Sequence, residues 1–129
     1  MGIKLVLQLL LIAAGGATGA LLRFWMSNGV SGVLGRGFPY GTMAVNIIGS
    51  FVMGFLFTWM MARGNMSPEG RSALTVGLLG AFTTFSTFSI ETMNLVESGE
   101  LSRAGINILL SVLLCLLGCW LGMMLGRQV

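Results

Sequence analysis

"SALTVGLLGAFTTFSTFSIETMNLV", residues 72–96, is apolar enough to span a membrane, yet it carries five hydroxyl side chains between residues 82 and 89. A spanning helix needs about 20 mostly apolar residues, and this stretch meets that length. Gly77 and Gly80 come first, and then a phenylalanine stands at every third position among Ser and Thr. Glycine lowers helix stability, and Ser and Thr side chains bond nearby backbone carbonyls. We therefore expect a transmembrane helix that breaks near residues 80–84.

The rest of the chain has the composition of a membrane protein. Of its 129 residues, 55% are hydrophobic and only 9% are charged, and the mean hydropathy is +0.91. A soluble domain of this size could not bury so much apolar surface. Three further apolar stretches of spanning length lie at residues 5–26, 41–61 and 103–125. We expect an all-α membrane protein with one four-helix transmembrane domain over residues 1–129.

Short polar segments separate the four spans. Residues 27–41 are rich in Gly and Ser, and we interpret them as the first loop. In the second loop Ser67 precedes Pro68 and Glu69, the pattern of a helix N-cap followed by a first-turn proline and acid. The third span should begin there. The third loop, "ESGEL" at residues 97–101, is so short that the third and fourth spans should form an antiparallel hairpin.

The basic residues give almost no orientation signal. Four spans place both chain ends on one side of the membrane, so Lys and Arg can be counted on each side. The count is four against three: Lys4, Arg63, Arg71 and Arg127 on the terminal side, and Arg23, Arg36 and Arg103 on the other. Two interpretations remain open, a single orientation set by one residue of bias, or insertion both ways up with opposite copies pairing about a two-fold axis.

The sequence lacks the parts of an enzyme. It has no histidine, no lysine beyond Lys4, and no two carboxylates at one membrane depth, which leaves acid–base, nucleophilic and metal-assisted mechanisms without residues. Cys115 and Cys119 stand four apart on one expected helix inside the membrane, so we expect no disulfide between them, and without histidine they cannot form a standard zinc site.

Neutral polar residues instead form narrow stripes on two spans. Asn46 and Ser50 are four apart on the second span, and Asn107, Ser111 and Cys115 follow the same spacing on the fourth, so each set shares a helix face. Such residues are costly in hydrocarbon and face a partner or a water-filled path. Interhelical hydrogen bonding and a transport pathway both fit the stripes.

A break in the third span has a chemical consequence. It frees backbone carbonyls at membrane depth, where irregular backbone is tolerated only if it is buried in protein or lines a cavity. Freed carbonyls suit a hard monovalent cation such as sodium. Phe82, Phe85 and Phe88 would share one face of a continuing helix, as packing residues or as part of a site.

Three motifs together resemble a known family. The stretch "GLLGAFTTFSTFSIE" at residues 77–91 is similar to the signature of the Fluc (CrcB) fluoride channels, and "GGATGALLR" and "PYGTMAVNIIGSFVMG" in the first two spans agree. The resemblance covers all four spans in order. It implies a dual-topology homodimer in a bacterial inner membrane, with two antiparallel pores through which cytoplasmic fluoride leaves by passive diffusion, and a structural sodium ion at the dimer centre.

The resemblance also implies roles for particular residues. It assigns the backbone carbonyls of Gly80 and Thr83 to the sodium ion, and it makes Phe85 and Phe88 the rings that line the pore. The positive edges of such rings can face an anion. Arg23 corresponds to a family arginine near the vestibule.

The full set of expected pore residues comes from the second, third and fourth spans. It comprises Thr42, Asn46, Phe85, Phe88, Ser89, Glu91, Asn107, Ser111 and Cys115. Relatives more often carry Tyr or His at the position of Asn107 and Ser or Thr at that of Cys115. The sequence therefore departs from the family pattern at these two places.

Two other classes of protein remain as alternatives. A small dual-topology, proton-coupled multidrug exporter also has four spans and a membrane carboxylate, but its acid belongs deep in the bundle. Here the first two expected spans hold no acid, and Glu91 falls near the end of the third. The second alternative is a noncatalytic subunit of a larger complex, in which the polar stripes would be contact surfaces.

Overall fold

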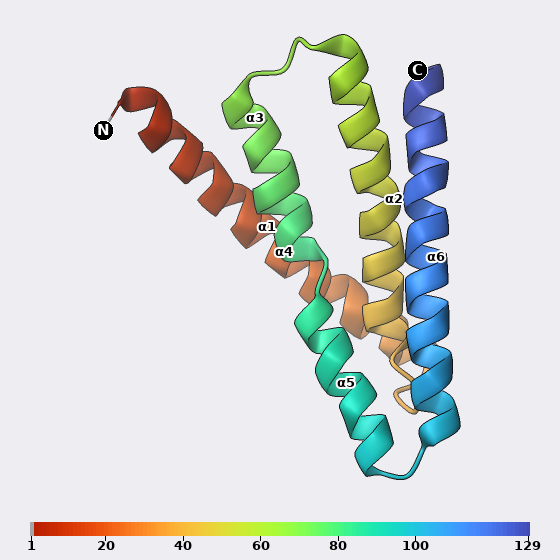
Figure 1. Cartoon of the computed structure of the whole chain (residues 1–129). Helices are drawn as coiled ribbons and strands as arrows, with labels where there is room; N and C mark the ends of the chain where they lie inside the picture. The colour runs from red at the N-terminus through yellow and green to blue at the C-terminus, as the bar shows by residue number, and fades with distance from the viewer. Residues whose placement is uncertain (1) are drawn as a thin grey trace.

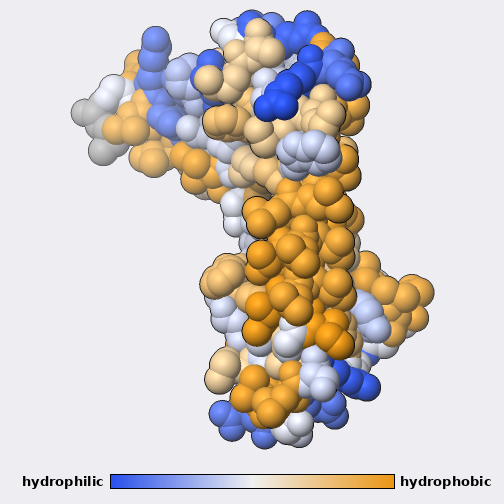
Figure 2. Space-filling view, turned by 45° about the vertical axis from the view of Figure 1, so that its right-hand side comes forward, coloured by the Kyte–Doolittle hydropathy of each residue, from blue (hydrophilic) through white to orange (hydrophobic). Residues whose placement is uncertain are grey.

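A computed structural model describes residues 2–129 and has four helices long and apolar enough to cross a membrane (Figure 1). They are α1 (Ile3–Leu34), α2 (Tyr40–Arg63), a third span over Pro68–Glu97, and α6 (Leu101–Gln128). The space-filling view shows an apolar belt between polar ends, as lipid and water on either side require (Figure 2). The expected all-α, four-span architecture is confirmed.

The first helix is longer than the sequence suggested. We expected a loop over residues 27–41, but α1 continues to Leu34 and only a short connection precedes α2. Polar residues in this stretch bond their own helix, as when the Asn28 amide donates to the Phe24 carbonyl at 2.8 Å. The helix ends where Gly35 adopts a φ of 98°, which other residues rarely tolerate. The expectation of a long first loop was wrong because its polar residues do not interrupt the backbone hydrogen bonds.

The third span consists of four consecutive segments. They are α3 (Pro68–Ser72), the π-helical segment η1 (Ala73–Leu79), α4 (Gly80–Phe82) and α5 (Phe85–Glu97). Its start was predicted correctly, since the Ser67 hydroxyl accepts the Gly70 amide at 3.1 Å as an N-cap. The π-helical segment was not predicted. The hairpin to α6 is confirmed, with Gly99 at a φ of 79° in the turn.

The break in the third span falls at two threonines. Thr83 has ψ 158° and Thr84 has φ −152° and ψ 113°, so both are extended. Gly80 remains helical, with φ −61° and ψ −37°. The predicted break is therefore confirmed within residues 80–84, but it begins after Phe82 rather than at the glycine.

Glycines allow the helices to approach each other closely. A Cβ atom at Gly122 or Gly126 would collide with the backbone of α2 at Phe51 or Phe55, and α2 and α6 pack side by side (Figure 1). In α1, a Cβ at Gly15 would lie 2.5 Å from the Ala73 carbonyl oxygen. These glycines of the first and last spans thus allow close helix packing, a common use of glycine in membrane helices.

Candidate functional site

Asn46 of α2 holds the break in place. Its Oδ1 accepts the backbone N–H of Thr84 at 2.7 Å, and its Nδ2 donates to the Thr84 carbonyl at 3.0 Å. The Asn46 side chain thus bonds both backbone groups of Thr84, which in a continuous helix would bond other backbone groups. Because unsatisfied backbone groups cost several kcal/mol in a membrane, this pair of bonds makes an extended residue tolerable at that depth.

The break releases the carbonyls of residues 80–83 from their helical donors, and Gly80 and Thr83 are two of these. In a continuous helix the Thr84 amide would bond the Gly80 carbonyl, but it donates to Asn46 instead. The Thr87 amide would bond the Thr83 carbonyl, but it donates to the Thr84 hydroxyl at 3.1 Å. The family resemblance assigns the carbonyls of Gly80 and Thr83 to sodium, and the carbonyl of Ala81, which the break also releases, accepts a hydrogen bond from Arg23.

The hydroxyls of residues 82–89 mostly serve the backbone. Thr83 Oγ1 donates to the Leu79 carbonyl at 2.9 Å, and Ser89 Oγ donates to the Phe85 carbonyl at 2.9 Å. Thr84 acts as the N-cap of α5 and also donates to Thr87 Oγ1 at 2.9 Å. The hydroxyl run thus closes one helix end and starts the next.

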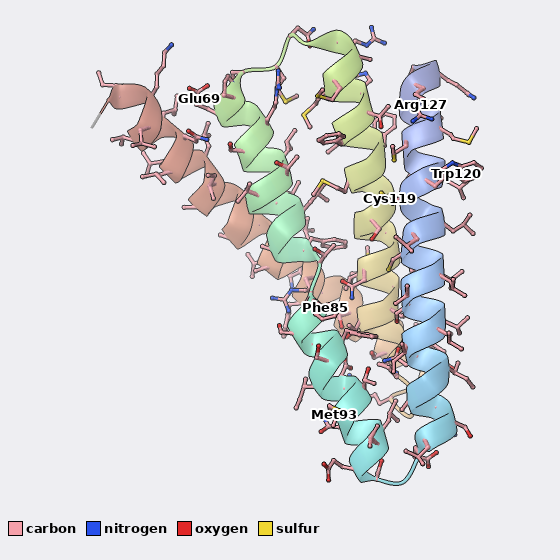
Figure 3. All side chains as sticks on the ribbon, viewed as in Figure 1. Glu69, Phe85, Met93, Cys119, Trp120 and Arg127 are labelled. Carbon is pink, nitrogen blue, oxygen red and sulfur yellow. The ribbon has the colours of Figure 1, made fainter. Side chains whose placement is uncertain are left out.

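An open groove of about 480 Å³ lies beside the break, between α2, α5 and α6. Phe85 and Phe88 line it with ring centroids 5.3 Å apart and planes tilted by 41°. Phe85 is 78% exposed and lies just beyond the break (Figure 3). Phe82 does not join them, because the break separates it and it is buried. The groove is also lined by Asn46, Gly49, Ser50, Met53, Thr83, Thr84, Ser111, Val112, Cys115, Leu116 and Cys119.

The predicted polar stripes face this groove from opposite helices, except for Asn107, which is buried behind it. Asn46 and Ser50 line it from α2, and Ser111 and Cys115 line it from α6. Gly49 of α2 leaves the space that the broken segment occupies, since a Cβ there would collide with the Thr83 methyl group. Five of the nine expected pore residues line the groove, whereas Thr42, Ser89, Glu91 and Asn107 do not.

A chain of buried hydrogen bonds runs from the groove into the hairpin. Ser111 Oγ donates to Asn107 Oδ1 at 3.2 Å, Asn107 Nδ2 donates to Thr92 Oγ1 at 2.8 Å, and Thr92 donates to the Phe88 carbonyl at 2.7 Å. Asn107 is only 1% exposed. Sequence reasoning missed Thr92, although it stands four residues after Phe88, at the spacing that brings a hydroxyl to that carbonyl.

A polar pocket of about 290 Å³ lies at the end of the hairpin, between α1, the connection from α1 to α2, and α5. Glu91 forms part of its wall, and its Oε1 accepts a short hydrogen bond from Thr42. Arg36 and Asn94 also line the pocket, and the sequence prediction included neither. There was little indication of either residue in the sequence, because Arg36 falls in the expected first loop and Asn94 follows the motif in an otherwise ordinary helix.

Arg23 lies within α1 and contacts the break. Its Nε donates to the Ala81 carbonyl at 2.9 Å, a carbonyl that borders the extended residues. The residue is half-buried. We expected it near a vestibule; in the structure it lies beside α4, where it satisfies another carbonyl released at the helix interruption.

Four membrane-spanning helices, a broken third span and a groove lined by uncharged polar and aromatic residues define a small membrane transport protein. Comparison with known proteins identifies the particular family. Residues 10–123 match the family of CrcB-like proteins, described as camphor resistance (CrcB). Relatives called fluoride-specific ion channel FluC match as well. The chain therefore belongs to the CrcB/FluC family of fluoride-specific ion channels.

Three of these relatives show the extent of the similarity. The Methylococcus capsulatus protein is 58% identical over 106 residues, which cover 82% of this chain and 46% of that protein. The Magnetococcus marinus protein is 52% identical over 107 residues, covering 82% of this chain and 86% of that protein. The Geobacter sulfurreducens protein is 49% identical over 104 residues, covering 81% and 84%. This chain thus spans less than half of the first relative and most of the other two.

Proposed function

We propose that this chain conducts fluoride passively across a bacterial inner membrane and so lets cytoplasmic fluoride leave the cell. One observation carries the proposal: Phe85, Phe88 and Ser111 share a groove beside a chain of neutral hydrogen-bonding side chains. The names of the relatives, which are fluoride-specific ion channels, supply the ion.

The groove suits a small anion that must bind and leave quickly. Conduction requires sites that are favourable enough to enter and weak enough to release the ion. Ring edges of Phe85 and Phe88, the Ser111 hydroxyl and the Asn46 Nδ2 are weak positive partners, and no Lys or Arg lines the groove among the described residues. A full cation there would hold fluoride more strongly than a row of neutral donors.

We further propose that the working channel is an antiparallel homodimer. The groove is open on one side, and Phe85 stands 78% exposed at its edge. A second, almost wholly apolar hollow of about 880 Å³ lies across α1, α2 and α4, where Trp25, Val52 and Phe82 contribute. A partner chain would cover both surfaces.

We propose that a sodium ion binds where the broken helices of two chains meet. The carbonyls of Gly80 and Thr83 fit this role, because the amides that would bond them in a continuous helix donate to other oxygens. Unwound backbone carbonyls are the usual sodium ligands in membrane proteins with discontinuous helices. When bound, the ion would supply fixed positive charge near the pores and link the two interrupted spans.

Fluoride flux from proteoliposomes tests the proposal. Purified protein in vesicles loaded with fluoride should release it down its gradient without a proton gradient, as followed by a fluoride-selective electrode. Proton-driven uptake of organic cations would support the multidrug exporter instead. Vesicles that release neither would support the assembly subunit, and either result would overturn the channel proposal.

A further inference from the structure

Three sulfur-containing side chains line the same groove. Cys115 and Cys119 come from α6 and Met53 comes from α2, and all three are half-buried. We call this set the sulfur cluster. Neither cysteine is in a disulfide. The fluoride path proposed above gives no role to Met53 or Cys119.

The helices meet closely at this cluster. A Cβ atom added to Gly54, the neighbour of Met53, would lie 3.2 Å from the Cα of Cys119 and would collide with its carbonyl oxygen. On α6 the two cysteines are one turn apart, a spacing that brings Cβ atoms to about 5–6 Å. The two thiols therefore share one face of α6, and the Met53 thioether lines the same groove from the closely packed α2. Figure 3 shows Cys119 at this α2–α6 contact.

Thiols and thioethers are soft ligands that favour soft metal ions over hard ones. The hydroxyl, carbonyl and amide groups of the groove favour hard ions, so the sulfur cluster differs in selectivity from its surroundings. We propose that the sulfur cluster binds a soft monovalent metal ion, Cu(I) or Ag(I), and that this binding blocks the proposed fluoride path. The second half of this inference rests on the proposed function.

The binding step balances as a simple proton exchange. One cysteine loses its S–H bond, its proton passes to water, and the remaining electron pair forms the bond from sulfur to the metal. The second thiol and the Met53 thioether donate lone pairs as neutral ligands. The complex of one thiolate with one monovalent cation carries no net charge. It therefore blocks by filling the groove next to Ser111 and Phe88 rather than by trapping the anion.

Silver ion is the practical probe, since it needs no reductant and silver fluoride is soluble. Silver should bind purified protein at one ion per chain and protect both thiols from a maleimide reagent. Cys115→Ser, Cys119→Ser and Met53→Leu should each weaken binding by on the order of tenfold or more, because each removes one ligand. Met93→Leu is the matched control, because Met93 is 51% exposed on α5 away from the groove, and it should bind silver as the unchanged protein does (Figure 3).

The same variants in proteoliposomes test the block. Silver should stop fluoride efflux through the unchanged protein and through Met93→Leu, while efflux through Cys115→Ser and Cys119→Ser, each compared with its own silver-free rate, should continue. Binding that is unaffected by the cysteine variants would overturn the metal site. Normal binding with undiminished efflux would overturn the block. A protein that binds silver but never conducts fluoride would refute the proposed function while leaving the metal site standing.

Discussion

Asn46→Leu should destabilise the protein more than any other change of one polar side chain in the described spans. Leucine has nearly the same size and shape, so packing is largely kept, but both bonds to Thr84, at 2.7 and 3.0 Å, disappear. The Thr84 amide and carbonyl then remain at membrane depth without a side-chain partner. The main structural role of Asn46 is therefore to satisfy the backbone of Thr84, in addition to any hydrogen bond that it donates to an ion.

The size of the effect follows from those two groups. A buried backbone donor or acceptor left unsatisfied costs about 1–3 kcal/mol, so two of them cost about 2–6 kcal/mol. An ordinary interhelical hydrogen bond in a membrane averages only about 0.6 kcal/mol, because its groups find other partners when it is lost. Thr84 has fewer alternatives while the helix stays broken. We therefore expect a loss of about 2–4 kcal/mol.

Unfolding by SDS in mixed micelles measures this loss, and the chain offers a matched control. Asn28 makes one hydrogen bond within its own helix, from Nδ2 to the Phe24 carbonyl, and is exposed. Asn28→Leu should change the unfolding free energy by less than about 0.5 kcal/mol, as surface substitutions usually do. If Asn46→Leu proves as stable as Asn28→Leu, Asn46 does not hold the break and this reasoning fails.

The other predictions concern the pore, the sodium site and the orientation. Phe85→Ile and Phe88→Ile should leave a folded protein but reduce fluoride efflux severely, because isoleucine fills space without a positive ring edge; normal efflux through both would exclude the rings from the path. Gly80→Leu should abolish dimer recovery in size-exclusion chromatography, because within the chain a Cβ there meets only the Thr75 carbonyl, at 3.4 Å, so that the larger side chain acts mainly on the partner. Gly105→Leu is the control and should leave the dimer intact. An intact Gly80→Leu dimer that retains sodium would contradict the site. Tags at the carboxyl terminus should label both membrane sides, and one-sided labelling would rule out dual topology.

The sequence predicted the elements that depend on local chemistry. The four spans follow from apolar length, the start of the third from the Ser67 N-cap, and its break from glycine and hydroxyl residues that weaken a helix. The end of α1 was missed, because Gly and Ser in residues 27–34 tolerate a helix as well as a loop. Local pattern could not distinguish the two, and in the structure this part of α1 packs against α2 at Gly41.

The contacts that complete the site depend on tertiary structure and could not be predicted in the same way. Asn46 is 38 residues from Thr84 in sequence, and nothing local indicates that a side-chain amide on one helix will bond both backbone groups of the other. The π-helical segment η1 likewise arises where Gly77 packs against α1, with its Cβ position 2.7 Å from the Ile12 carbonyl oxygen. Pattern reasoning located polar residues in the membrane but not their partners.

Packing and transport, the two interpretations of the polar stripes, make different demands that neighbouring residues of one stripe meet differently. Asn107 uses its oxygen for Ser111 and its nitrogen for Thr92, bonds of the kind that interhelical packing requires. Ser111 lies at the groove, and its bond to Asn107 is 3.2 Å, longer than the 2.5–3.0 Å usual for hydroxyl donors and therefore weak. On the proposed fluoride path, a hydroxyl held by so weak a bond would turn toward the anion at little cost. The buried chain behind Ser111 then keeps it near the groove without competing strongly for its proton.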